Sequence, residues 1–417
     1  MTDCERAAGP GQFAPDGSVI SYSTNESDEF NKQDVDVAGV DGSGARNLEV
    51  GDTGAEASFA DWHSDCDRLR VGDNSDDLTR CGVYSIETDS VEWYGDSEVE
   101  ESPVAFVDED RFVAQRTRRA ATVPVVYDLA TGESRELDLP EGVASVPAVG
   151  EPVLSDGRVI LGHSTPTRRS ELIAYDLDSD EYEMLMAADY GDIDPDVFVD
   201  GEYFEFRSDG VPETPARAVE HDPYEPLDIE GIFYDSGERP SPLVVKIHGG
   251  PPAQDQRSFD LYTQFLATRG YSVLQVNYRG STGRGVEFKR ALYDDWGGAE
   301  QGDIATGVEH TLESRDFLDE DRVAVFGGSY GGYSAYWQMV QYPDLYDAGI
   351  AWIGLTDLVG MFETTMPHFR TELMEKNLGT PEDNPDLYEL RSPITHVDNV
   401  SAPLCMIHGV NDRRVPI

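Results

Sequence analysis

The sequence predicts two regions of different fold class: an all-β region over residues 1–215 and a doubly wound α/β region over residues 216–417. Two observations support this division. A unit of 44 to 47 residues recurs through the first half, and from Pro242 onward short apolar runs alternate with amphipathic stretches. A chain of 417 residues is also longer than a single hydrophobic core usually serves.

The repeated unit begins with an apolar residue shortly before a turn, at Phe13, Phe59, Phe106, Val153 and Val197. Each unit continues with short strands of alternating polarity and closes with a hairpin. Such a period, with about four strands per unit, is typical of a β-propeller blade, so we expect a partial propeller of about four blades. Only four units are complete, and four blades are the fewest that close a propeller, so either the propeller is small or open or further blades precede Met1, and we favour further blades. An irregular β-sandwich is the alternative, although it would not require equal spacing.

In the second region the apolar runs are expected to be buried strands of a mostly parallel sheet that is covered by helices on both faces. The predicted strands are residues 243–247, 272–276, 323–326, 348–352 and 404–407, and the predicted helices are residues 259–268, 300–314 and 330–342.

The segment Gly327-Gly328-Ser329-Tyr330-Gly331 matches the pattern G-x-S-x-G and lies between a predicted buried strand and a predicted helix. The nucleophilic serine of an α/β hydrolase requires this context, because the turn lifts its hydroxyl above the sheet. Ser329 is therefore the expected catalytic nucleophile. The backbone N–H of Tyr330, at the start of the helix, is expected to face the developing oxyanion. A purely structural glycine-rich turn is the alternative.

Two further segments agree with this interpretation. The run His248-Gly-Gly-Pro251 follows the first predicted strand of the region, where an oxyanion-hole loop belongs, and the Gly250 amide is the expected second donor. Asp412 follows the last predicted strand and comes after Ser329, as the triad acid does in α/β hydrolases. An ordinary turn residue is the alternative for Asp412.

These segments resemble the prolyl oligopeptidase family, and most closely its acylaminoacyl-peptidase and dipeptidyl-aminopeptidase branch. The matching segments are His248-Gly-Gly-Pro251, Asn277-Tyr-Arg-Gly-Ser-Thr-Gly283, Trp296-Gly-Gly298 with Asp303, Gly327-Gly-Ser-Tyr-Gly-Gly332, Ser392-Pro-Ile-Thr-His-Val397 and His408-Gly-Val-Asn-Asp412-Arg-Arg-Val-Pro416. The resemblance implies a propeller ahead of an α/β-hydrolase domain, and a serine-type peptidase that acts on short peptides. It also implies Ser329 as nucleophile, Asp412 as triad acid, the Gly250 and Tyr330 amides as oxyanion hole, and no metal or cofactor.

The expected triad lacks its histidine, which should follow the acid, because all eight histidines precede Asp412. His396 and His408 are expected to be structural. We therefore expect a chain that lacks both ends of a longer peptidase and leaves an apolar sheet edge exposed. A downstream segment or companion chain would supply the histidine, and the chain alone should have little activity. The alternatives are an esterase on the same fold and a non-catalytic pseudoenzyme or fragment of a split peptidase.

The charge balance is extreme, with 82 acidic against 31 basic residues and a net charge of −51. The acids recur in every segment, which favours the salt-adapted surface of an extreme halophile over a patch for a basic partner. This charge repels nucleic acid, and no apolar run is long enough for a membrane span. The start has no secretory signal pattern, so a soluble cytoplasmic protein is expected. Cys66 and Cys81 are expected to be free thiols, and Cys405 a core residue.

Overall fold

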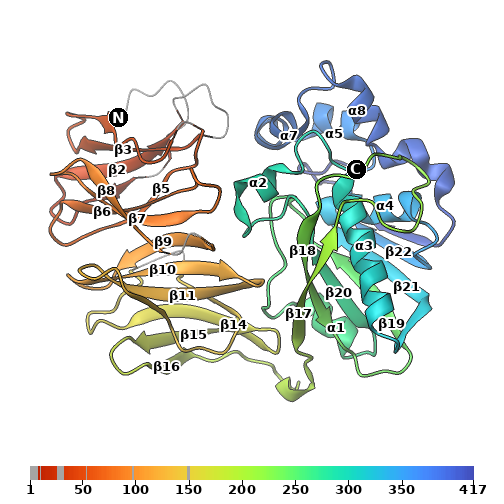
Figure 1. Cartoon of the computed structure of the whole chain (residues 1–417), viewed down its shortest axis with the longest axis horizontal. Helices are drawn as coiled ribbons and strands as arrows, with labels where there is room; N and C mark the ends of the chain where they lie inside the picture. Colours follow the sequence, from red (N-terminus) through yellow and green to blue (C-terminus); the bar gives the residue numbers. More distant parts are fainter. Residues whose placement is uncertain (1–7, 10, 26–31, 53, 96–97, 148–150) are drawn as a thin grey trace. The chain divides into compact units, whose positions relative to one another are not determined.

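The computed structural model describes the chain except residues 1–7, 10, 26–31, 53, 96–97 and 148–150 (Figure 1). The described chain divides into two compact units. Unit 1 comprises Met1–Gly191 with Gly283–Val286, and unit 2 comprises Asp192–Thr282 with Glu287–Ile417.

Unit 1 consists of antiparallel sheets of the kind that form propeller blades. Its strands are β1 (Gln12–Phe13), β2 (Val19–Thr24), β3 (Asp34–Gly39), β4 (Arg46–Asn47), β5 (Ser58–Trp62), β6 (Arg68–Asp73), β7 (Arg80–Ser85), β8 (Ser90–Tyr94), β9 (Glu100–Phe106), β10 (Arg111–Arg118), β11 (Ala121–Asp128), β12 (Ser134–Glu136), β13 (Val143–Ser145), β14 (Val159–Thr165), β15 (Arg168–Asp176) and β16 (Glu181–Met186). Strands β1–β4 and β5–β8 form separate four-stranded sheets, whereas a parallel pairing of β11 with β13 joins the next two sets of four. The predicted unit starts at Phe13, Phe59 and Phe106 lie in β1, β5 and β9.

The predicted unit start at Val197 is wrong. Val197 ends a short 3-10 helix, η1 (Pro195–Val197), and the strand that follows, β17 (Gly201–Ser208), pairs along its whole length with β18 (Leu227–Tyr234). That pairing places β17 in the sheet of unit 2. Residues 192–215, which were predicted to belong to the first region, therefore fall in unit 2, and eight residue pairs hold residues 201–208 of this segment in its sheet.

Unit 2 has a seven-stranded sheet in the order β17-β18-β20-β19-β21-β22-β23. The remaining strands are β19 (Ser241–Ile247), β20 (Ser272–Asn277), β21 (Leu318–Gly328), β22 (Ala348–Trp352) and β23 (Leu404–Ile407). Strands β19 to β23 pair in parallel, and β17 and β18 add an antiparallel edge that the sequence analysis did not predict. The sheet is therefore mostly parallel, as an α/β hydrolase requires.

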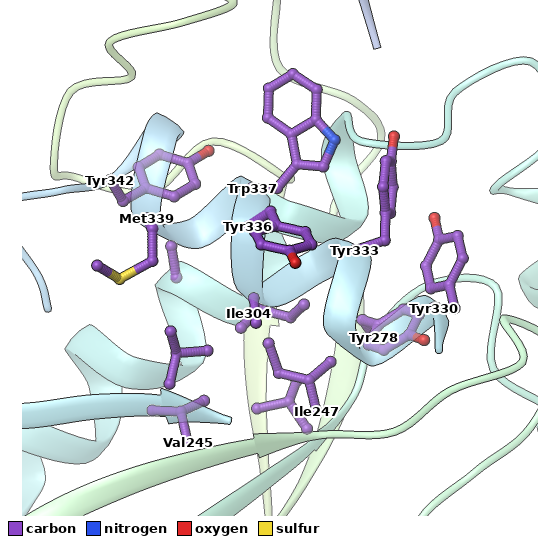
Figure 2. Close-up of a cluster of buried hydrophobic side chains, with 14 of the residues drawn as sticks. Val245, Ile247, Tyr278, Ile304, Tyr330, Tyr333, Tyr336, Trp337, Met339 and Tyr342 are labelled. Carbon is purple, nitrogen blue, oxygen red and sulfur yellow. The ribbon is translucent and has the colours of Figure 1, made fainter. Parts of the chain in front are cut away.

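Helices cover both faces of this sheet. The helices are α1 (Leu261–Ala267), α2 (Gly285–Arg290), α3 (Ala299–Ser314), α4 (Tyr330–Gln341), α5 (Leu358–Thr364), α6 (Pro367–Phe369), the π-helix η2 (Arg370–Glu375), α7 (Lys376–Leu378), α8 (Pro385–Leu390) and the 3-10 helix η3 (Pro393–Asn399). Alternate residues of β19, including Val245 and Ile247, point into the core beneath α3 and α4 (Figure 2). In the described part of the chain, no helix is both long and apolar enough to cross a bilayer.

Residues 404–407 were predicted to be a buried strand, and the predicted burial is wrong, because most of β23 is exposed; the apolar sheet edge that was expected to be exposed is confirmed here. Met406 and Ile407 are 67% and 51% exposed, and Cys405 is exposed rather than part of the core. The reason is that β23 is the outer strand of the sheet and pairs with β22 alone among the described residues. Cys66 and Cys81 are free thiols, as predicted.

A buried ion pair links two of the sequence segments in unit 2. Arg279, just after β20, makes two side-chain bonds to Asp303 on α3, at 2.7 and 2.8 Å, and its backbone N–H donates to the same carboxylate at 3.0 Å. The Ser208 hydroxyl donates to Asp303 at 2.6 Å, which ties β17 to the pair. Both charged side chains are buried, so each compensates the other in a low-dielectric site.

We expect Asp303→Asn to lower the free energy of unfolding by about 3–5 kcal/mol, because it removes the carboxylate that is directly bonded to the buried Arg279 guanidinium. Denaturant titration at constant salt measures the effect. The matched control is Asp344→Asn, which removes the acid of an exposed pair with Arg217 and should cost less than about 1 kcal/mol. Equal losses in the two variants would contradict the structural role of the buried pair.

Candidate active site

Ser329 occupies a strained turn between β21 and α4. Its backbone angles are φ 58° and ψ −122°, in a region that non-glycine residues rarely adopt. The Ser329 amide donates to Trp352 O at 3.0 Å, and its carbonyl accepts from Tyr333 N at 3.0 Å. The turn therefore has the strand-to-helix geometry that the G-x-S-x-G pattern predicts.

Three glycines around Ser329 are required by close backbone approach. A Cβ on Gly327 would lie 2.1 Å from Gly331 O, and a Cβ on Gly331 would lie 2.1 Å from Ile247 O. A Cβ on Gly332 would lie 2.7 Å from Trp352 O. These contacts pack the ends of β19, β21 and β22 against the first turn of α4.

The loop after β19 lies directly against the serine. A Cβ on Gly249 would be 3.4 Å from Ser329 Cβ and 3.8 Å from Tyr330 N. The Tyr330 amide stands at the first position of α4, where a helix offers it no acceptor of its own. Gly250 has φ 130°, which favours glycine. Its role as the second oxyanion donor stays a prediction.

His248 anchors this loop. Its Nδ1 lies 2.9 Å from Gly249 O and its Nε2 lies 3.0 Å from Ser281 Oγ. The ring stacks on Tyr278 with centroids 4.4 Å apart. Burial lowers the pKa of His248, so the ring is neutral near pH 7. Both ring nitrogens are thus engaged in holding the loop rather than the Ser329 hydroxyl.

Asp412 lies in a tight loop after β23. Its Oδ1 accepts the N–H groups of Arg414 and Val415, each at 2.9 Å, and its own N–H donates to Gly409 O at 3.1 Å. His408 closes the loop by donating from Nε2 to Val415 O at 2.7 Å. The backbone thus holds Oδ1 of the carboxylate, and the role of Asp412 as triad acid stays a prediction.

None of the eight histidines, all of which lie in the described part of the chain, is bonded to Ser329 or Asp412. His408 binds its own loop, and His396 Nε2 donates to Leu390 O at 2.9 Å. Both histidines therefore bind backbone carbonyls near them, which agrees with the prediction that they are structural. Also among the described residues, no group of His, Cys, Asp or Glu side chains is arranged to hold a metal ion.

A cavity of about 770 Å³ in unit 2 was missed by the sequence analysis. Its apolar lining includes Leu355, Met361, Ile394, Met406 and Val415. Gly354, which also lines it, packs against Gly332 of the serine turn, since a Cβ on Gly332 would lie 2.8 Å from Gly354 Cα. The lining comes from four separate segments, so no local pattern could have revealed it.

Glu300 was also missed, although it lies next to the predicted Trp296-Gly-Gly298 segment. Its carboxylate accepts from the Tyr330 hydroxyl at 2.9 Å, beneath the serine turn. The sequence signal was weak, because one glutamate in a chain with 82 acidic residues does not stand out.

Part of the chain is similar to known proteins. Residues 257–417 match the prolyl oligopeptidase family. Dipeptidyl aminopeptidase BIII of Pseudoxanthomonas mexicana is 37% identical over 182 residues, which is 43% of this chain and 26% of that protein. The acylamino-acid-releasing enzyme of Mus musculus is 35% identical over 206 residues, which is 46% of this chain and 28% of that protein.

Solved structures share the fold over nearly the whole chain. A crystal structure of puromycin hydrolase has a TM-score of 0.80 at 22% identity and covers 98% of this chain and 62% of its own. The Pyrococcus horikoshii acylaminoacyl peptidase has a TM-score of 0.73 at 22% identity, with 99% and 62% covered. The matched region thus spans about a quarter of the curated relatives and about three-fifths of the structural neighbours.

We expect Gly331→Ala to destabilise unit 2 by about 3 kcal/mol, because the added methyl group would displace Ile247 from the start of α4. Thermal unfolding would measure the change. Gly409→Ala is the matched control, since nothing lies within 4 Å of its added Cβ. A variant at Gly331 as stable as the one at Gly409 would show that the close approach is not required.

Proposed function

We propose that this chain, whose residues 257–417 match the prolyl oligopeptidase family, is the nucleophile-bearing part of a serine peptidase that hydrolyses short peptides. The observation that carries the proposal is the left-handed backbone of Ser329, packed against Gly249 and the amide of Tyr330. This arrangement presents a hydroxyl beside a helix N-terminus, where negative charge on a substrate carbonyl is stabilised.

In the proposed reaction Ser329 Oγ attacks the scissile carbonyl while its proton passes to an imidazole base. The oxyanion forms between the amides of Tyr330 and Gly250. The imidazolium then gives its proton to the leaving amine, which leaves an ester at Ser329. Water, deprotonated by the same base, attacks this acyl-enzyme and releases the acid, and the proton returns to Ser329.

The imidazole is proposed to come from outside these 417 residues, in a downstream segment or a companion chain. Two features support this idea. Asp412 is held with Oδ2 available to orient an imidazole N–H. Apolar side chains of β22 and β23 are also exposed on one face of the sheet, with Ile350 and Trp352 each 38% exposed and Ile407 paired with Trp352, and a further segment could cover them.

Peptides are the proposed substrates rather than simple esters. The apolar lining of the 770 Å³ cavity suits an apolar side chain of the substrate. Among the relatives, one is named a dipeptidyl aminopeptidase and another an acylamino-acid-releasing enzyme, and both names describe peptide-bond cleavage near a chain end. No nucleic-acid or membrane partner is proposed.

Chemical rescue tests the proposed site. We expect added imidazole to speed the labelling of Ser329 by a fluorophosphonate probe at least tenfold, because it replaces the missing base. Ser329→Ala should abolish labelling, and Asp412→Asn should remove most of the imidazole gain because the bound imidazole loses its orienting acid. Intact mass spectrometry measures the rate.

The control for that experiment is Asp398→Asn, which changes an exposed carboxylate on η3 and should leave the gain unchanged. Aminoacyl and acyl-aminoacyl anilides beside p-nitrophenyl esters then separate peptidase from esterase. Labelling that does not depend on Ser329, or no labelling with imidazole, would favour a non-catalytic protein.

We propose that the protein works in a cytoplasm of molar salt. Its 82 acidic residues repel one another, and at about 1 M salt the Debye length falls to about 3 Å. We therefore expect the denaturant midpoint to rise between 0.2 M and 3 M KCl. The measurement is a denaturant titration at each salt concentration in urea, which carries no charge. A midpoint that falls or stays constant across this range would contradict salt adaptation.

A further inference from the structure

We infer that Glu300 is a positioning residue for the oxyanion hole: it holds the side chain of Tyr330, and through it the amide beside Ser329. The inference rests on the proposed function, since it assigns a second layer of residues to that same site. Glu300 itself contacts no substrate in this scheme and acts through Tyr330.

The Glu300 carboxylate is surrounded by donors. It is the second residue of α3 and is fully buried. Oε1 accepts from Gly297 N at 2.5 Å, from Tyr330 Oη at 2.9 Å and from Gln301 Nε2 at 2.9 Å. Oε2 accepts from Gly298 N at 2.9 Å. Three of these hydrogen bonds hold the carboxylate in place, and the fourth connects it to the tyrosine hydroxyl.

Tyr330 is confined by rings on its remaining sides. The edge of Trp296 lies against it with centroids 5.1 Å apart, and Tyr333 follows at 5.2 Å. Tyr278 lies 6.2 Å away in a stacked orientation, and Figure 2 shows Tyr278 and Tyr330 side by side at the start of α4. Because its hydroxyl is bonded to Glu300, the Tyr330 side chain cannot swing about its Cα–Cβ bond without breaking that hydrogen bond.

The same cluster reaches the second part of the oxyanion hole. Tyr278 stacks on His248 and donates from its hydroxyl to His248 O at 3.2 Å. His248 in turn holds Gly249, which packs against Ser329. The two backbone segments proposed to bind the oxyanion therefore rest on one buried aromatic cluster, and Glu300 is the charged group at its base.

Charged and titratable groups around Glu300 make its ionisation sensitive to pH. Burial, and then the negative charge of Asp295, raise the pKa of Glu300 to about 7. Arg391 opposes this effect and binds Asp295 at 2.6 Å. The charged and titratable groups that interact electrostatically with Glu300 include Asp295, Arg391, Arg279, Tyr224, Tyr278, Tyr330, Tyr333 and Tyr342.

The two protonation states differ in what they can hold. The ionised carboxylate accepts all four donors, whereas the protonated form carries a hydrogen of its own among groups that are already donors. Deprotonation should therefore tighten the hold on Tyr330. It should also lower stability, because a folded-state pKa above the ordinary 4.5 stabilises the fold below pH 4.5 and loses that contribution as pH rises through about 7.

The test compares wild type with Glu300→Gln, Tyr330→Phe and the double variant in imidazole-supported labelling of Ser329. We expect each single variant to lose about tenfold in rate above pH 8, and the double variant to lose about the same rather than a hundredfold. The ratio of the wild-type rate to the Glu300→Gln rate should rise as pH rises through about 7, while relative stability falls. The titration of the added imidazole affects both rates equally, so it cancels in this ratio.

Glu309→Gln is the matched control, because Glu309 lies on the same helix and binds the amides of Glu213 and Thr214. It should label at the wild-type rate at every pH. A Glu300→Gln variant that labels like wild type, or a rate ratio that is flat between pH 6 and pH 8, would overturn the inference.

If wild type is not labelled at all, the proposed function fails and the unfolding equilibria of the same four proteins decide the inference. Coupling of about tenfold in the unfolding constant between Glu300 and Tyr330 would support the hold. Independent effects would overturn it.

Discussion

The close approach of backbone segments around Gly331 is the constraint on which the rest of unit 2 depends. Gly331 lets the first turn of α4 contact the end of β19, and Gly327 lets the same turn contact β21. Ser329 is held at a positive φ between them, with its amide bonded to β22. The strain at one residue is thus supported by three neighbouring strands, as a reactive serine turn requires.

Beneath this turn the unit uses buried charge rather than apolar packing alone. Asp303 binds Arg279 at the end of β20, and Glu300 binds Tyr330 at the start of α4. Both acids lie on α3. One helix therefore binds the segment that follows β20, through Arg279, and the segment that follows β21, through Tyr330 next to Ser329. Such groups contribute orientation more than stability, because their desolvation offsets much of their attraction.

At the surface, unlike in this interior, acidic side chains are in large excess over basic ones. Acids outnumber bases by 82 to 31, and many of the arginines are already paired with carboxylates, as Arg118 is with Glu136 and Arg158 with Asp156. The excess acids are left to interact with solvent and ions. Carboxylates at the surface are therefore solvated, whereas the buried carboxylates of unit 2 each bind specific hydrogen-bond donors.

The sequence by itself determined the repeat of unit 1, the parallel strands of unit 2 and the position of Ser329, because these depend on local periodicity and on glycine spacing. Only the tertiary structure decided that β17 joins the second sheet, that a cavity forms beside the serine turn, and that Glu300 lies beneath Tyr330. Each of these depends on contacts between segments far apart in the chain. A local pattern carries no information about which partner a strand edge or a buried carboxylate will meet.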